Sequence, residues 1–279
     1  MIKPVQRELY AVIGSPVAHS LSPIMMAAAF EALDHPAVYL ALEVDSFEED
    51  LRVLAAVGLR GLSVTLPHKV EAFRLALKRD ETAEAIGAVN TLRREGAGWQ
   101  GRNTDWMGAT LALKRVTALE GKSALVLGAG GVARAVVYGL KREGARVTVA
   151  NRDHDRGRRL AELFDCSCIA LDALRADPTA RSFDVVVQCT SVGLMKSGSE
   201  PLVPDSFFRA GMVVMDTVYR PAWTDFLLSA KGAGCTGVRG SEMLIYQGVA
   251  QLEWWLGKSM PPHVVDRMRA VVEGALLHG

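Results

Sequence analysis

The sequence contains few cysteines, and their spacing is not that of metal ligands. Its 279 residues include four, at Cys166, Cys168, Cys189 and Cys235, and no paired C-x-x-C set. We therefore expect no structural zinc and no other metal site. Scattered cysteines in a chain whose start has no apolar signal core fit a reducing compartment, so we expect a cytoplasmic protein.

Long apolar runs and an excess of one charge are also missing. No run reaches the length of a membrane span. Lys and Arg number 32 against 31 Asp and Glu, a formal net charge of +1. We therefore expect neither nucleic acid nor a membrane surface as a partner. The chain has no internal repeat or low-complexity segment, and 49% of it is hydrophobic, which is ample for a packed core. Its length favours two domains.

A glycine-rich stretch between residues 123 and 152 carries the strongest pattern. Residues 124–127 form a short apolar run typical of a buried strand, and apolar residues recur at helical spacing over 132–140. Residues 146–150 are typical of a second strand. The turn between the first strand and the helix matches the dinucleotide fingerprint, with alanine at the third small position: Gly128, Ala129, Gly130, Gly131, Val132 and Ala133.

Each small residue of this turn has a physical role. Gly128 permits a tight turn, Gly130 lets the backbone approach a pyrophosphate, and Ala133 allows the helix to pack closely on the strand. The helix N-terminus offers free N–H groups to the phosphates. A glycine-rich turn without a ligand is the alternative, which the strand–helix–strand context disfavours.

The end of the second strand indicates which dinucleotide binds. NAD sites usually place an acidic residue there, whereas this strand ends in Asn151 and Arg152, with Arg156 one turn later. Two guanidinium groups suit a 2′-phosphate, so the sequence favours NADP. Asp153 and Asp155 leave an alternative open, because either could cap a helix or turn toward the ribose and favour NAD.

A serine pair follows the first expected strand, residues 9–13. Ser22 precedes Pro23, which predicts a helix that Ser22 caps and Pro23 begins. Ser20 and Ser22 would then lie at a helix N-terminus, where two hydroxyls and the helix dipole can receive a carboxylate.

The following segments alternate between strand and helix, which predicts a parallel sheet with crossover helices. Strands are expected over 38–44 and 61–66, with helices over 47–57 and after Pro67. Ligands of such sheets bind beyond the carboxyl ends of the strands. Thr65 and Lys69 fall at these ends, although a lysine in this position can also be a solvated helix residue.

Polar residues also interrupt later apolar segments. Asn90 and Thr91 lie within an expected strand over 84–92, where they need hydrogen-bond partners in the protein or a ligand. Asp105 precedes an expected helix, as a cap or as a functional group. After the glycine-rich stretch, an expected strand over 184–189 ends in a loop suited to cover a nucleotide, at Thr190, Ser191 and Val192.

Taken together, the motifs resemble the shikimate dehydrogenase family over nearly the whole chain. They are the serines, V-T-x-P-x-K at 64–69, G-A-V-N-T at 87–91, N-T-D at 103–105, the glycine turn with Asn151-Arg152, and G-x-E-M-L-x-x-Q-G at 240–248. No one motif is decisive, but the ordered set is specific.

The resemblance implies reversible, NADP-linked reduction of 3-dehydroshikimate to shikimate in aromatic amino-acid biosynthesis. It implies that Ser20 and Ser22 hold the substrate carboxylate and that Lys69 and Asp105 are the catalytic pair. Asp105 would also hold substrate hydroxyls, together with Thr65, Asn90 and Gln247. Tyr219 and Met243 match positions lining the substrate and nicotinamide region, and Gly240 is counted with the cofactor positions.

The resemblance also implies two α/β domains. We expect a substrate-binding and catalytic domain over 1–105 with a mainly parallel sheet, and a Rossmann-type NADP-binding domain over 106–239. The helices of 240–279 would return to the first domain. The expected partner is the small-molecule substrate, bound by a monomer or homodimer.

Two departures from the family pattern concern specificity. Ser63 stands where many members have a substrate-binding Asn, and Asp153 stands where NADP-binding members often have Thr. A quinate/shikimate dehydrogenase with relaxed use of NAD and NADP is therefore the alternative enzyme. A non-catalytic nucleotide-binding regulator on the same fold is a further alternative, which the presence of both Lys69 and Asp105 disfavours.

Overall fold

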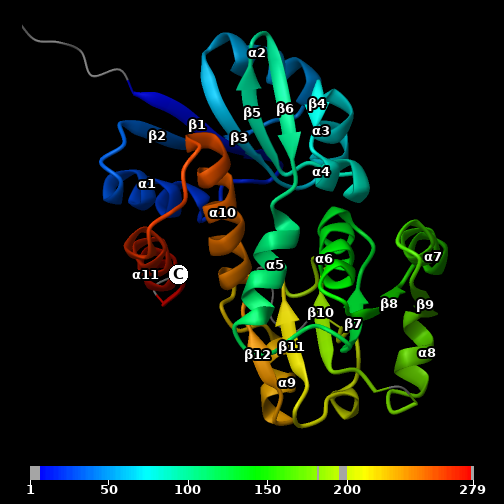
Figure 1. The fold of residues 1–279 in the computed structure, drawn as a ribbon. Helices are drawn as coiled ribbons and strands as arrows, with labels where there is room; N and C mark the ends of the chain where they lie inside the picture. The colour runs from blue at the N-terminus through cyan, green and yellow to red at the C-terminus, as the bar shows by residue number, and fades with distance from the viewer. Residues whose placement is uncertain (1–6, 181, 195–199, 278–279) are drawn as a thin grey trace, which may run out of the picture. The chain divides into compact units, whose positions relative to one another are not determined.

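The computed structural model describes residues 7–180, 182–194 and 200–277. The chain divides into two compact units: Met1–Thr104 with Gln247–Gly279, and Asp105–Tyr246 (Figure 1). Each has its own six-stranded sheet. Among the described residues, no helix is long and apolar enough to cross a membrane.

The first unit is built on a mixed sheet of order β2-β1-β3-β5-β6-β4. β1 pairs in parallel with β2 and β3, while β5 runs antiparallel to both β3 and β6. Its elements in chain order are β1 (Glu8–Gly14), α1 (Ser22–Ala32), β2 (Ala37–Glu43), α2 (Phe47–Ala56), β3 (Leu59–Val64), α3 (Lys69–Leu75), β4 (Lys78–Arg79), α4 (Glu81–Ile86), β5 (Thr91–Glu95) and β6 (Gly98–Arg102).

The expected strand over 84–92 is wrong in its first half. Asp80 caps a helix there, because its carboxylate accepts the Ala83 N–H at 2.8 Å. Gly87 ends that helix in the left-handed region, with φ of +69°. The apolar run therefore begins as α4, and β5 starts only at Thr91, after Asn90.

The C-terminal segment covers part of the first unit. α11 (Pro262–Leu277) packs against α1, and α10 (Gly240–Leu256) passes close to the same helix. A Cβ at Gly248 would lie 2.6 Å from the Met25 methyl carbon and 3.2 Å from that of Met26. Glycine at this position lets the two helices approach.

The second unit is a fully parallel sheet of order β12-β11-β10-β7-β8-β9. This is the Rossmann order: successive strands are added on one side of β7 up to β9, and then on its other side from β10 onward. Its elements are α5 (Asp105–Lys114), β7 (Ser123–Leu127), α6 (Gly131–Arg142), β8 (Arg146–Asn151), α7 (His154–Leu163), β9 (Ser167–Ala170), α8 (Leu171–Ala176), β10 (Val185–Gln188), η1 (Asp205–Phe207), β11 (Val213–Asp216), α9 (Asp225–Gly232) and β12 (Thr236–Val238). The predicted α/β class and Rossmann unit are confirmed.

The contact between α5 and α6 depends on a glycine in the middle of α6. A Cβ at Gly139 would lie 2.7 Å from the Thr110 methyl carbon and 3.2 Å from the Trp106 carbonyl oxygen. The second contact is with backbone, so it cannot be relieved by a side-chain rotation.

We expect Gly139→Ala to lower the free energy of unfolding by about 1–3 kcal/mol, because overpacking outweighs the helix propensity gained. Denaturant unfolding of the purified protein measures the change. Gly274→Ala in α11 is the control, because no atom of the described residues lies within 4 Å of its Cβ position. That variant should be unchanged or more stable. Equal stability of the two variants would contradict the packing argument.

Candidate active site

The serine pair lies in the turn between β1 and α1. α1 begins at Ser22, Leu21 is its N-cap residue, and no side chain caps it in the usual way. The prediction that Ser22 is the cap is therefore wrong. Pro23 has no N–H, so the Ser22 amide is an early donor that needs a partner, and the Ser20 Oγ accepts it at 3.2 Å. Ser20 is half-buried, and Ser22 is buried.

Thr65 and Lys69 flank the turn that leaves β3. The Thr65 N–H donates to the Ile13 carbonyl at 2.9 Å, which keeps the ends of β1 and β3 together. Lys69 is the first residue of α3 and is only 7% exposed, so it is not a solvated helix residue. Its carbonyl accepts the Val89 N–H at 2.9 Å.

His68 fixes the start of α3, and the sequence reasoning missed it. Its imidazole stacks on Phe47, with ring centroids 4.8 Å apart. Its Nε2 donates to the Val44 carbonyl at 3.2 Å, and its Nδ1 lies 3.4 Å from the Glu71 carboxylate. The signal was its place between the proline and the lysine of the V-T-x-P-x-K motif.

Asn90 is the centre of a buried hydrogen-bond cluster. Its side-chain oxygen accepts the Thr104 N–H at 2.7 Å and the Thr91 hydroxyl at 2.8 Å. Its side-chain nitrogen donates to the Thr104 hydroxyl at 3.0 Å and to the Gln247 amide oxygen at 3.4 Å. The polar pair Asn90-Thr91 thus has partners within the protein, and these fix the orientation of the Asn90 amide.

A second chain of hydrogen bonds joins this cluster at the Thr91 hydroxyl. The Tyr39 hydroxyl donates to the Ser63 Oγ at 2.6 Å, and Ser63 donates to the Gln251 amide oxygen at 2.7 Å. The Gln251 nitrogen donates to the Thr91 hydroxyl at 3.1 Å. Burial raises the pKa of Tyr39, so it remains a donor. Sequence reasoning missed Gln251, although its position four residues after Gln247 puts both on one helix face.

The glycine turn of the second unit has the two features expected of its first two glycines. Gly128 has φ of +116°, and a Cβ there would lie 3.1 Å from the Thr190 methyl carbon and 3.2 Å from the Cys189 carbonyl oxygen. The Cβ position of Gly130, by contrast, has no atom of the described residues within 4 Å. Packing within the described residues therefore explains Gly128 but not Gly130, whose Cβ position is open space.

The two acidic residues that follow β8, Asp153 and Asp155, both have partners within α7. Asp153 is the N-cap of α7, with its carboxylate accepting the Arg156 N–H at 3.0 Å. Asp155 forms an ion pair with Arg158 at 3.1 Å. Each of the two acidic residues thus has a partner in α7, and Asn151 donates to the Asp153 carbonyl at 2.8 Å.

Arginine side chains meet the glycine turn from two elements. The Arg156 Nε donates to the Ala129 carbonyl at 3.1 Å, and Arg152 is exposed at the end of β8. Sequence reasoning missed Arg134, in the first turn of α6, whose pKa is lowered by burial and by the charge of Arg156. Helical side chains lean toward the helix N-terminus, so Arg134 adds positive charge beside the turn. A phosphate group would relieve this repulsion.

The remaining predicted residues are distributed over both units. Asp105, the buried first residue of α5, and Tyr219, in the loop after β11, belong to the second unit, whereas Gln247 belongs to the first. Gly240 begins α10, and a Cβ there would lie 2.5 Å from the Val218 carbonyl oxygen. Met243 is buried in the core of the second unit.

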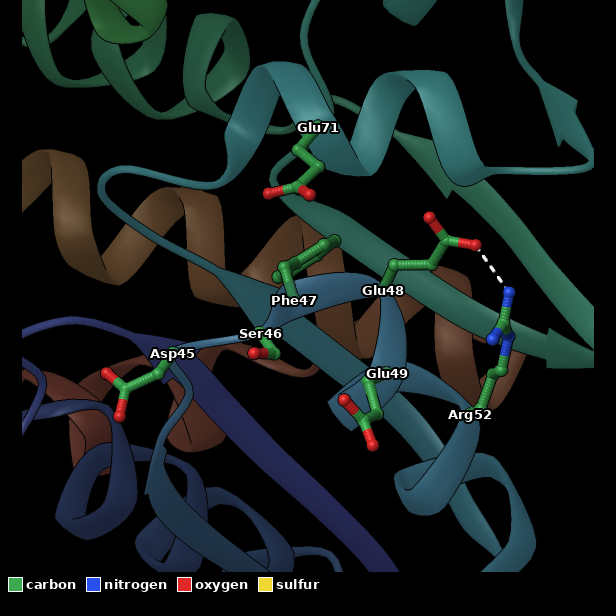
Figure 2. A pocket seen from close by; sticks show the side chains of 7 residues that line it. All are labelled: Asp45, Ser46, Phe47, Glu48, Glu49, Arg52 and Glu71. Carbon is green, nitrogen blue, oxygen red and sulfur yellow. Dashed lines mark hydrogen bonds and ion pairs between the residues drawn. The ribbon is translucent and has the colours of Figure 1, made fainter.

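A separate hollow of about 400 Å³ opens beside the start of α2 (Figure 2). It contains none of the predicted site residues. Its walls are mostly carboxylates, which would repel an anionic substrate, and within the described residues no group of three or more His, Cys, Asp or Glu could hold a metal ion. The lining residues are Asp45, Ser46, Phe47, Glu48, Glu49, Arg52 and Glu71.

The second unit, with its glycine turn and cationic strand end, defines a dinucleotide-binding protein. Three family models match the chain: "Shikimate dehydrogenase substrate binding domain" over 12–92, "Shikimate / quinate 5-dehydrogenase" over 110–200, and "Shikimate 5'-dehydrogenase C-terminal domain" over 240–273. The chain belongs to the shikimate dehydrogenase family, as its motifs indicated.

Individual relatives agree with this assignment. The shikimate dehydrogenase (NADP(+)) of Syntrophobacter fumaroxidans is 62% identical over 98% of this chain and 96% of its own length. The Thermus thermophilus shikimate 5-dehydrogenase, solved with NADP(H) and shikimate, is 36% identical with a TM-score of 0.87, covering 96% of this chain and 100% of that one. A 5-ketofructose reductase of a Gluconobacter strain has a TM-score of 0.84 at 29% identity, covering 98% of this chain and 100% of that one.

The contact between the serines generates a stability prediction. We expect Ser20→Ala to lower the free energy of unfolding by about 1 kcal/mol, because the Ser22 amide loses its acceptor. Ser22→Ala should change it by less, because its own Oγ caps no amide of α1. Denaturant unfolding of the two variants decides between them, and a larger loss for Ser22→Ala would restore Ser22 as the cap.

Proposed function

We propose that this protein catalyses the reversible, NADP-dependent reduction of 3-dehydroshikimate to shikimate, a step of aromatic amino-acid biosynthesis. The observation that carries the proposal is the 62% identity to a shikimate dehydrogenase (NADP(+)) over nearly the full length of both chains. The arginines around the glycine turn support the choice of NADP. Nicotinamide absorbance after mixing protein, NADP and shikimate tests it.

Residues 1–105 would bind the substrate in this proposal. Ser20 and Ser22 receive the carboxylate, in the turn at the carboxyl end of β1. The hydroxyls would be held by Thr65, Asn90, Asp105 and Gln247, and Tyr219 is also assigned to the substrate. Four hydrogen bonds within the protein hold the Asn90 amide in one orientation, so a substrate hydroxyl would bind it in exchange for the longest of them, the 3.4 Å contact with Gln247.

Residues 106–239 would bind NADP, with the helices of 240–279 completing the protein. Gly130 gives the pyrophosphate its close approach, and Arg152 and Arg156 hold the 2′-phosphate. The other residues assigned to the cofactor are Gly128, Ala129, Gly131, Val132, Ala133, Asn151, Thr190, Ser191, Val192, Gly240 and Met243. We also assign a cytoplasmic location, supported by four free cysteines, and a monomeric or homodimeric state.

The nicotinamide supplies or accepts the hydride when bound, and the protein supplies the proton transfer. In reduction, the Lys69 ammonium donates a proton to the substrate oxygen as negative charge develops on it. In oxidation, the Lys69 amine accepts that proton. Asp105 orients Lys69 and holds a neighbouring hydroxyl. The low exposure of Lys69 supports this assignment, because a proton donor excluded from water is more effective.

The second candidate function, a quinate/shikimate dehydrogenase, differs from the first in the range of substrates and cofactors it accepts. The Ser63 hydroxyl accepts a hydrogen bond from Tyr39 and donates one to Gln251. It therefore adds no selectivity for one substrate over the other. A quinate/shikimate dehydrogenase using NAD and NADP would share every other feature. An assay of shikimate and quinate, each with NADP and NAD, separates the two enzymes, and absence of turnover with all four pairs would favour a regulator.

The cofactor assignment predicts a selective loss. We expect Arg152→Ala to raise the KM for NADP about ten- to a hundredfold, because a charge-assisted hydrogen bond to the 2′-phosphate is removed. The KM for NAD should change little. Arg158→Ala is the matched control, since Arg158 lies on α7 and pairs with Asp155 and Glu162. Equal losses with both cofactors would defeat the assignment.

The catalytic assignment predicts a loss in kcat. We expect Lys69→Ala to lower kcat at least about a hundredfold at saturating substrate while NADP still binds. Asp105→Asn should also lower kcat, and the double variant should lose less than the product of the single losses, because the two residues act together. If Lys69→Ala raises the KM for shikimate and leaves kcat nearly intact, Lys69 binds substrate without transferring a proton.

A further inference from the structure

Two fully buried polar residues lie side by side at the carboxyl edge of the second sheet. Gln188 is the last residue of β10, Asp216 is the last residue of β11, and the two are paired in the strand register. Both are 0% exposed. Neither belongs to the substrate or cofactor residues assigned above, and a buried carboxylate costs free energy unless its partners repay it.

Asp216 holds the loop that follows β11. One carboxylate oxygen accepts the Val218 N–H at 2.9 Å, and the other accepts the Thr224 hydroxyl at 2.6 Å. The two contacts fasten both ends of the loop that carries Tyr219. Gln188 is a further hydrogen-bond partner of the carboxylate, so three donors converge on Asp216.

Gln188 holds the loop that follows β10 in the same way. Its amide nitrogen donates to the Val192 carbonyl at 2.9 Å, and its amide oxygen accepts the Thr190 N–H. The nitrogen has two hydrogens, enough for both Val192 and Asp216. The Thr190 hydroxyl then accepts the Val192 N–H at 3.1 Å, which closes the loop on itself.

The two loops contain or contact several of the cofactor residues outside the glycine turn. The β10 loop contains Thr190 and Val192, and the Thr190 methyl carbon lies 3.1 Å from the Cβ position of Gly128. The β11 loop contains Tyr219, and its Val218 carbonyl lies against Gly240. A shift of the β10 loop would therefore move groups beside Gly128, and a shift of the β11 loop would move groups beside Gly240.

We propose that Asp216 and Gln188 are positioning residues that lock the β10 and β11 loops into the arrangement required for NADP, acting as one hydrogen-bonded unit. The inference rests on the proposed NADP binding. In this proposal, a buried carboxylate controls cofactor affinity through two loops. Asp216 is not itself among the residues assigned to substrate or cofactor.

The ionised carboxylate is the form that fits this role. An ionised carboxylate only accepts hydrogen bonds, and all three groups facing Asp216 are donors, so a proton on it would oppose one of them. Burial raises the pKa of Asp216 to about 6. The Cys189 thiol, directly after β10, lies within the electrostatic field of Asp216, and its pKa is raised first by burial and then by the charges of Asp216 and Asp105.

The sign of the pH effect distinguishes positioning from a general contribution to stability. Because the pKa of Asp216 is raised on folding, its protonation favours the folded state as the pH falls from about 6 toward the ordinary carboxyl value of 3.8. NADP affinity should fall over the same range, since the protonated carboxyl group loses one loop contact. A merely structural residue would change stability and affinity in the same direction.

The test measures NADP binding by calorimetry, with thermal unfolding in parallel, on the full chain. Asp216→Asn should raise the Kd for NADP about tenfold or more at pH 8. Asp184→Asn is the matched control: Asp184 accepts the Ser123 N–H at 2.8 Å and the Ser123 hydroxyl at 2.7 Å, but at the amino edge of the sheet. It should lower stability and leave the Kd within about twofold.

The pH series supplies the second readout. The 2′-phosphate of NADP titrates near pH 6 as well, so the contribution of Asp216 is the part of the pH step that Asp216→Asn removes. Gln188→Met, similar in shape but without the amide, should also weaken NADP and serves if Asp216→Asn does not fold. An unchanged Kd in the folded Asp216→Asn variant, an identical pH step, or an equal loss in Asp184→Asn would overturn the inference. Failure of the wild-type protein to bind NADP would instead overturn the proposed function.

Discussion

A buried polar group without a partner is costly, and this constraint accounts for the arrangement of both sheets at their carboxyl edges. The loops at these edges contain amides that need acceptors. In the first unit the Asn90 amide meets this need for Thr104 and fixes its own orientation in doing so. In the second unit Asp216 meets it for Val218. The groups that satisfy the backbone also set the shape of the site.

The two units meet the constraint with different chemistry. The cluster of the first unit consists of hydroxyls and amides, which are neutral and suit hydroxyl groups of a substrate. The glycine turn of the second unit is bordered by guanidinium groups, which suit a phosphate. At the sheet edge of the second unit lies the Asp216 carboxylate, and burial raises its pKa to about 6.

Much of the fold could be read from the sequence because its signals are local. The glycine turn, β7 and β8 follow from spacing and strand length, and Asp153 was recognised as one of two candidate caps. The Ser22 cap and the strand over 84–92 were wrong for a shared reason. In each case a residue other than the one expected supplied the decisive hydrogen bond, Ser20 in the first and Asp80 in the second. Arg134, His68 and Gln251 were missed because their roles depend on neighbours distant in sequence or on an adjoining element.

The hydrogen-bond chain through Ser63 has a consequence for how specificity can change. Its neighbours, Tyr39 on β2 and Gln251 on α10, are far from it in the sequence, and both bond directly to its small hydroxyl. A bulkier amide at position 63 would displace one of these partners and leave a buried donor or acceptor unmet. The effect of a substitution at residue 63 therefore depends on which residues occupy positions 39 and 251. Evolution or design that introduces Asn there needs a compensating change at residue 39 or residue 251, so the three positions should covary.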